Sequence, residues 1–196
     1  MTEPPPELVV RCWPTTDPLY IAYHDEEWGR QVRDERGIYE RLCLEGFQSG
    51  LAWITILRKR EAFRERFAGF DPERVAAFGE RDVERLLGDP SIVRHRGKIE
   101  ASIANARATV ALREAGEPLE ELFWSHRPDD VPAPRSHADR RSTTPESEAL
   151  AKRLRREGFR FVGPTTLYAA MQACGLVNDH LADCWVRPDV EQAAVS

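Results

Sequence analysis

The sequence predicts an all-α protein. Two observations indicate this: signals that start helices recur along the chain, and between them apolar residues recur three and four positions apart. Alternation with a period of two, which is typical of strands, is nearly absent apart from "FRFV" at Phe159. The chain has 196 residues, 41% of them hydrophobic, which is enough to build a core. We expect one compact domain over residues 1–196.

Three helix starts are marked by a capping residue followed by proline. "FDPERVAAF" offers Asp71 as the cap, and "TTPESEALAKRLRREGF" offers Thr144 and then a glycine stop at Gly158. Such side chains accept hydrogen bonds from the free amides of the first turn, and proline fits the first helical position. "GDPSIV" repeats the pattern and predicts a further start at Asp89.

Apolar stripes identify two of the helices between these signals. One stripe contains Trp53, Ile56 or Leu57, Phe63 and Phe67, and the other contains Ile99, Ile103, Ala106 and Val110. The segment 125–143 is rich in proline, aspartate and arginine and predicts a loop between the last two helical blocks. No repeat has the spacing of a solenoid.

Cysteine and histidine gather near both ends of the chain. "GLVNDHLADCW" places His180 four residues before Cys184, one turn apart on a helix, and "RCWPTTDPLYIAYHDEEWG" contains Cys12 and His24. Together they match a Cys₂His₂ zinc site, although the spacing is not that of a zinc finger. Taken singly, His24 also fits a satisfied core or surface histidine, and Cys12 a buried apolar residue.

The remaining cysteines, Cys43 and Cys174, lie in apolar contexts and are expected in the core. Four scattered cysteines favour reduced thiols or metal ligands, with two disulfides as the alternative. The start "MTEPPPELVV" does not resemble a secretion signal, and no apolar run reaches about 18 residues. We therefore expect a soluble, cytoplasmic monomer without a membrane partner.

A basic turn predicts contact with phosphate. The net charge of −5 argues against a nucleic-acid partner, but residues 91–113 carry five basic residues against one acidic residue. In "SIVRHRGKIEASIANAR" a tight turn closes on Gly97, which allows a positive φ and the close approach of a ligand, and a helix starts at Lys98. Free amides there, with Arg94, Arg96 and Lys98, would hold a DNA backbone. Ordinary solvated arginines are the alternative.

Aromatic residues surround one carboxylate. Tyr20, Tyr23 and Trp28 occur in "PLYIAYHDEEWG", while Glu45 and Trp53 occur in "LEGFQSGLAWITIL". Because an ionised carboxylate is costly to bury, Glu45 either points to water or faces a pocket that uses it. A flat guest that is cationic or donates hydrogen bonds would suit such a pocket, and a nucleobase is such a guest.

Four blocks in order carry a resemblance to a known family. "DPLYIAYHDEEWG", "CLEGFQSGLAWITIL", "IVRHRGKIEASIANAR" and "GFRFVG…MQACGLVNDH" resemble the DNA-3-methyladenine glycosylase I family of the helix-hairpin-helix glycosylase superfamily, from Cys12 to Cys184. The resemblance implies a helix-hairpin-helix glycosylase fold in which zinc joins the N- and C-terminal segments. Residues 11–30 and 145–187 would form a zinc-clasped lobe, and residues 31–125 the helix-hairpin-helix lobe.

The resemblance also implies a role for each candidate residue. Those roles are zinc ligands (Cys12, His24, His180, Cys184), catalytic residues (Glu45, Tyr23), base-binding residues (Trp53, Tyr20, Trp28), a DNA-backbone anchor (Arg94, Arg96, Gly97, Lys98) and a residue that fills the gap left by the extruded nucleotide (Leu51). The sequence departs from the family at Phe47, Gln48 and Ser49, where Gln-Gln-Ala is frequent. The extension through Val10 and the tail after Trp185 have no clear counterpart.

The implied activity is base-excision repair in the bacterial cytoplasm, at the nucleoid. The protein would bind double-stranded alkylated DNA, flip out the damaged nucleotide and release free 3-methyladenine by hydrolysis, with structural Zn²⁺ as cofactor. The superfamily's usual aspartate after the hairpin is missing: the helix offers Asn105 and Arg107, and Glu114 and Glu117 come late. The alternatives are a non-catalytic lesion-binding protein and a zinc-stabilised interaction domain that does not bind DNA.

Overall fold

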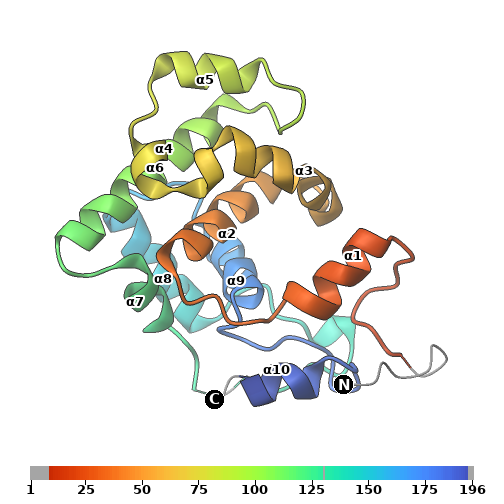
Figure 1. The fold of residues 1–196 in the computed structure, drawn as a ribbon. Coiled ribbons are helices and arrows are strands. Elements are labelled where there is room, and N and C mark those ends of the chain that lie inside the picture. Colours follow the sequence, from red (N-terminus) through yellow and green to blue (C-terminus); the bar gives the residue numbers. More distant parts are fainter. Residues whose placement is uncertain (1–8, 130, 194–196) are drawn as a thin grey trace.

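The computed structural model describes residues 9–129 and 131–193, and all regular secondary structure in these ranges is helical (Figure 1). This confirms the all-α prediction. The α-helices are α1 (Pro18–Ala22), α2 (Glu35–Gln48), α3 (Trp53–Arg66), α4 (Pro72–Ala76), α5 (Glu80–Leu87), α6 (Arg96–Glu114), α7 (Leu119–Trp124), α8 (Pro145–Arg156), α9 (Pro164–Ala173) and α10 (Arg187–Ala193). A π-helical turn, Tyr23–Glu27, continues α1, and two short 3₁₀ turns cover Ala68–Phe70 and His137–Asp139.

The main core forms around α2, which lies at the centre of the molecule between α3 and α9 (Figure 1). Most of α2 is buried, and its Phe47 packs against Phe63 and Phe67 with ring centroids 4.6 and 5.8 Å away. Helices α6, α8 and α9 complete this core. Cys43 and Cys174 are buried in it, as predicted, and all four cysteines are free thiols.

A smaller core joins the two ends of the described chain. Cys12, Tyr23 and Trp28 from the N-terminal segment pack with Cys184 and Val190 from the C-terminal segment. The Trp185 amide donates to the Val10 carbonyl at 3.2 Å, which fastens the segments side by side. The extension through Val10 and the tail after Trp185 had no clear counterpart in the family. Residues 1–8 and 194–196 of these ends lie outside the described residues, and the described part of the tail forms α10.

Two of the three predicted helix starts are confirmed. Asp71 accepts from the amides of Glu73 and Arg74 at the start of α4, and Thr144 accepts from the Ser147 amide at the start of α8. The prediction at Asp89 is wrong, because residues 89–95 form a turn between α5 and α6. Its carboxylate instead bonds to the Ser91 amide within that turn and to Arg66 of α3.

Lys98 connects α6 to the end of α2. Its ammonium group donates to the carbonyls of Phe47 at 2.9 Å and Ser49 at 2.6 Å, and only 8% of the residue is exposed. Burial lowers the pKa of Lys98. These bonds occupy two carbonyls at the C-terminal end of α2, where a helix leaves such groups without internal partners.

No helix among the described residues is long and apolar enough to cross a membrane.

Replacing Lys98 should therefore weaken the fold. In Lys98→Met the two carbonyls lose their donor, and we expect the free energy of unfolding to fall by about 1–3 kcal/mol in urea titration. The exposed Lys152 on α8 provides the control, for which the same substitution should change it by less than about 0.5 kcal/mol. Equal effects of the two substitutions would contradict the structural role of Lys98.

Candidate functional site

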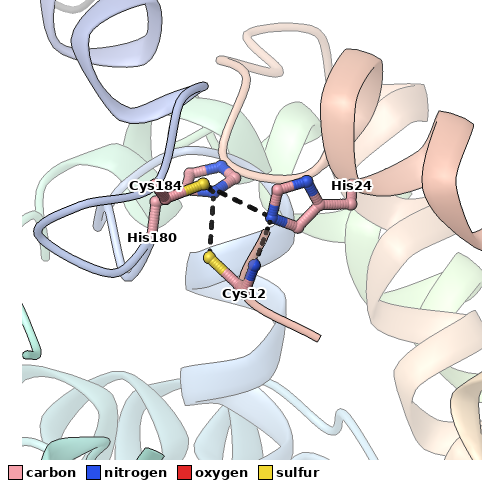
Figure 2. Close-up of side chains that lie close together, drawn as sticks. All are labelled: Cys12, His24, His180 and Cys184. Carbon is pink, nitrogen blue, oxygen red and sulfur yellow. Dashed lines mark hydrogen bonds between the residues drawn. The ribbon is translucent and has the colours of Figure 1, made fainter. Parts of the chain in front are cut away.

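The four predicted metal ligands converge in one buried cluster (Figure 2). The ligand atoms of Cys12, His24, His180 and Cys184 all lie within 4.8 Å of one another. The His180 Nδ1 atom is 3.5 Å from each of the two sulfurs, and the His24 Nε2 atom is 3.6 Å from the Cys184 sulfur. Two thiols and two imidazoles in this arrangement could hold a metal ion.

The outer nitrogens of both imidazoles have hydrogen-bond partners. His24 Nδ1 lies 2.7 Å from an Asp25 carboxylate oxygen, and His180 Nε2 lies 3.0 Å from the Trp28 carbonyl. Arg11 in turn holds Asp25 through bonds of 2.7 and 3.0 Å. Partners of this kind fix the ring orientation and direct the remaining nitrogen lone pair inward, as in metal-binding histidines. The donor set therefore fits a metal.

One expectation about this cluster is wrong. His180 and Cys184 do not lie on a helix, because the chain between α9 and α10 forms turns and bends. Gly175 ends α9 with φ of +74°, and a Cβ there would meet the Gly29 carbonyl oxygen at 2.6 Å. The turns bring the His180 and Cys184 side chains together nevertheless. A hydrogen bond from Cys12 lowers the pKa of the Cys184 thiol, with further contributions from both histidines.

An aromatic cavity of about 310 Å³ lies next to the cluster. It contains all five residues predicted for catalysis and base binding and six that the sequence analysis did not assign to it. Its lining is Trp13, Tyr20, Tyr23, Trp28, Glu45, Gln48, Trp53, Arg140, Arg141, Ala169 and Gln172. The rings of Tyr23 and Trp53 lie 5.3 Å apart and those of Trp13 and Tyr20 4.9 Å apart. A wall of rings at these distances suits a flat guest.

Glu45 is the acidic residue of this lining. It lies in the last turn of α2, which continues through Gly46, and only 6% of it is exposed. Burial raises the pKa of its carboxyl to about 8, against an opposing effect of Arg41. Burial also raises the pKa of Tyr23 well above its ordinary value, so its phenol is neutral. The sequence left open whether Glu45 points to water or faces a pocket, and in the structure it faces the pocket.

Gln172 gives the cavity a fixed acceptor that the sequence analysis missed. Its amide nitrogen donates to the buried Asp179 carboxylate at 2.6 Å, and the Tyr168 hydroxyl donates to the same oxygen at 2.7 Å. Because a carboxylate only accepts, the Gln172 amide nitrogen is held toward Asp179 and its oxygen is left for other partners. The pairing depends on the turns after α9, which bring Asp179 back to Tyr168 and Gln172, and the sequence pattern of α9 carries no signal of those turns.

Trp13 and Arg140 were also missed. Trp13 follows the ligand Cys12, and Arg140 lies in the segment predicted to be a simple loop. The Arg140 guanidinium lies 6.0 Å from the Trp13 ring and 5.7 Å from the Trp28 ring. Its Nε atom is buried without a hydrogen-bond partner among the described residues. Trp13 could have been identified from the sequence, because it lies next to a predicted metal ligand. An arginine in a loop has no sequence feature that marks it as part of a cavity.

The predicted phosphate anchor is only partly as expected. Helix α6 begins at Arg96, and Gly97 lies inside its first turn and does not have a positive φ. The Lys98 ammonium is turned inward to the carbonyls of Phe47 and Ser49 and does not point to the surface where phosphate was expected. Arg96 pairs with glutamates of α5 and α6. Arg94 is exposed at the turn, just before the start of α6.

Leu51 lies in the turn between α2 and α3 and is exposed. The turn is closed by two bonds between Gln48 and Leu51: the Leu51 amide donates to the Gln48 carbonyl at 2.6 Å, and the Gln48 side-chain amide donates to the Leu51 carbonyl at 2.7 Å. An exposed apolar side chain on a closed turn beside the cavity is available to an external partner.

Comparison with known proteins identifies the family. The family profile described as "Methyladenine glycosylase" matches residues 13–187. The chain belongs to the methyladenine glycosylase family. It is 50% identical to DNA-3-methyladenine glycosylase 1 of Escherichia coli K12, over 91% of this chain and 97% of that protein. It is 44% identical to DNA-3-methyladenine glycosylase of Haemophilus influenzae, over 90% and 97%.

Solved structures of methyladenine glycosylases have the same fold. A crystal structure of 3-methyladenine DNA glycosylase I superposes with a TM-score of 0.88 at 51% identity and covers 91% of this chain and 100% of its own. The Staphylococcus aureus enzyme, solved to explain its recognition of 3-methyladenine, superposes with a TM-score of 0.84 at 36% identity, over 89% and 94%.

The raised pKa of Glu45 predicts how its burial affects stability as pH changes. The folded protein keeps the carboxyl protonated up to about pH 8, whereas the unfolded chain loses that proton near 4.5. This group therefore makes stability fall as pH rises from about 4.5 to 8, by at most about 1.4 kcal/mol per pH unit.

Urea unfolding of the parent and of Glu45→Gln at several pH values tests this. The variant cannot ionise, so its stability relative to the parent should rise between pH 5 and 8 and level off above that. A difference that stays constant over this range would contradict the burial of an ionisable carboxyl at position 45.

Proposed function

We propose that the protein is a base-excision repair glycosylase that releases 3-methyladenine from alkylated DNA by hydrolysis of the N-glycosidic bond. The proposal is supported by the named activity of the relatives at 50% and 44% identity over nine-tenths of the chain. The observation that carries it is the buried Glu45 carboxyl in a cavity walled by tyrosine and tryptophan rings. Such a cavity suits a flat, positively charged base.

The substrate needs little chemical activation, because methylation at N3 gives the base a positive charge. When the bond to the sugar breaks, its electron pair stays with the base, which leaves as neutral 3-methyladenine. Water adds to the sugar carbon and loses one proton to solvent. We assign Trp53 to stacking on the base, with Tyr20 and Trp28 beside it. Glu45 and Tyr23 would hydrogen-bond the base edge. Binding the base where its charge can move onto the sugar lowers the barrier.

Variants of solved relatives support the choice of Tyr23 and Glu45. One structure, at 35% identity, carries phenylalanine in place of a tyrosine and contains 3-methyladenine. Another carries glutamine in place of a glutamate. The residue numbers of the two changed positions differ by the same amount as those of Tyr23 and Glu45 in this chain.

Helix α6 places no acid in the cavity lining, and its Glu100 pairs with Arg96. The side-chain amide of Asn105 bonds to both backbone groups of Arg160, and Arg107 donates to the carbonyls of Ala76 and Phe78. Glu114 ends α6 and is exposed, and Glu117 is bonded to Arg153. The reaction would therefore rely on the cavity itself.

For DNA binding we propose a helix-hairpin-helix formed by α5, the turn 88–95 and α6. The free amides at the start of α6 and the exposed Arg94 would hold phosphates of a double-stranded substrate. Leu51 would occupy the space left by the extruded nucleotide. We further propose a monomer that acts at the nucleoid, with residues 11–30 and 145–187 forming one lobe and residues 31–125 the other.

We propose that the ion held by Cys12, His24, His180 and Cys184 is a structural Zn²⁺. All four ligand positions are filled by protein groups, as in structural zinc sites, and the two thiolates balance the charge of the ion. Bound zinc would fasten the N-terminal segment to the turns before α10. Its role would be to stabilise the lobe that carries Tyr20, Tyr23 and Trp28.

A non-catalytic lesion-binding protein would use the same DNA surface but has no need of the buried carboxyl. Activity therefore separates the two functions. We expect the parent protein to release free 3-methyladenine from methylated duplex DNA, identified by chromatography of the bases. Glu45→Gln should reduce the rate about 100-fold, because it replaces an ionisable carboxyl with a neutral amide, and Tyr23→Phe about 10-fold, because it removes the hydroxyl bond to the base edge.

The exposed Glu148 on α8 provides the control, and Glu148→Gln should release the base at the parent rate. Duplex binding without base release by the parent would favour the lesion-binding protein. A Glu45→Gln rate equal to that of the parent would contradict the role of the cavity.

Metal analysis of freshly purified protein tests the zinc site. We expect about one zinc per chain, its loss in Cys184→Ser, and a lower melting temperature after chelation, because a structural metal contributes directly to folding. Cys43→Ser is the matched control, since Cys43 is equally buried but lies in the other core. Less than half an equivalent of zinc in the parent, with no effect of chelator on melting, would contradict the proposal.

A further inference from the structure

Phe161 combines exposure with an unfavourable backbone conformation. Its φ is +55°, in the left-handed region that side chains other than glycine rarely adopt. The residue is 42% exposed, although its neighbours Phe159 and Val162 are buried. The chain therefore accepts backbone strain and an exposed ring at the same position, and neither stabilises the free protein. Conformations of this kind persist where the surroundings enforce them, frequently at functional sites.

A buried side chain holds the backbone directly before Phe161. Asn105 of α6 is 3% exposed; it accepts from the Arg160 amide at 2.7 Å and donates to the Arg160 carbonyl at 3.1 Å. Both backbone groups of the residue before Phe161 are thus fixed by one amide. This clamp fixes the backbone that leads directly into Phe161, whose ring is exposed at the surface in the free protein.

The ring lies between the two elements proposed to contact DNA. Its centroid is 6.2 Å from that of His95, which caps α6, and a Cβ on Gly97 would lie 3.9 Å from the tip of the ring. On the other side, a Cβ on Gly46 would lie 3.5 Å from the Phe161 Cβ. Gly46 is in the last turn of α2, directly before the turn that carries Leu51.

We propose that Phe161 is a second apolar contact to the DNA duplex, which packs against the bases beside the gap left by the extruded nucleotide. The inference rests on the proposed function, because duplex DNA is the partner expected at this surface. Leu51 and Phe161 are two of the four large apolar residues with notable exposure among the described residues. Apolar side chains that enter a base stack stabilise the distorted duplex, and a ring held in place beforehand loses little freedom on binding.

The experiment replaces Phe161 with glycine and measures stability and binding separately. Glycine adopts positive φ without strain, so Phe161→Gly should melt at the same temperature as the parent or higher. Its affinity for a duplex that contains a stable abasic-site analogue should fall about tenfold. Binding of free 3-methyladenine, followed by tryptophan fluorescence, should not change, because Phe161 is not part of the cavity lining.

Salt dependence distinguishes an apolar contact from a charged one. The slope of log affinity against log salt concentration should be unchanged in Phe161→Gly, whereas Arg94→Ala should reduce it by about one unit. Val10, which is 41% exposed, serves as the control, and Val10→Ala should bind the duplex as the parent does. Phe161→Leu, which keeps an apolar side chain, should retain part of the affinity.

Two results would overturn the inference: duplex affinity of Phe161→Gly equal to that of the parent, or a large loss of melting temperature with weaker binding of free base and duplex alike. The latter would assign Phe161 to the fold. If the parent itself neither binds the duplex nor releases 3-methyladenine, the proposed function fails. A parent that does both, with Phe161→Gly unaffected, refutes this inference alone.

Discussion

The buried Cys/His cluster is the constraint on which the cavity depends. Cys12 and His24 belong to the cluster, and their neighbours Trp13 and Tyr23 line the cavity. Trp28 contributes its ring to the cavity and its carbonyl to His180. Arg60 of α3 also holds the π-helical turn, through bonds to Glu27 at 2.6 and 2.7 Å. The placement of the aromatic wall therefore follows from how firmly the N-terminal segment is attached to the turns before α10.

The cavity contains buried polar groups that lack hydrogen-bond partners among the described residues. Glu45 is buried with a raised pKa, the indole nitrogen of Trp53 has no hydrogen-bond partner among the described residues, and neither does the Arg140 Nε. Unpaired polar groups in a low-dielectric setting are unfavourable. A guest with matching donors and acceptors would relieve that cost, so selectivity and affinity would have the same origin. An apolar molecule of the same shape would leave the cost in place.

Local chemistry in the sequence predicted much of this structure, and long-range contacts explain where it did not. Caps such as Asp71 and Thr144 act on amides two or three residues away, so their pattern is sufficient. Asp89 has the same pattern, but Arg66 from α3 and Ser91 compete for its carboxylate, and the helix does not form there. The direction of the Lys98 side chain was set by carbonyls about 50 residues away in sequence, which no local rule contains. The ligand cluster and the aromatic residues were identifiable because their chemistry is rare and their resemblance to the family extends over nearly the whole chain.

The π-helical turn at Tyr23–Glu27 limits how this segment can change during evolution. Its widened ring, closed by the Trp28 amide on the Tyr23 carbonyl at 2.8 Å, lets consecutive side chains serve two different sites. Loss of one residue from the turn would restore ordinary helical spacing and rotate everything before it by roughly 100°. Ligand and ring would then face the wrong directions together. The number of residues in this turn should therefore vary far less among relatives than their identity. A relative that lacks one residue of the turn should have lost both the Cys/His cluster and the aromatic cavity.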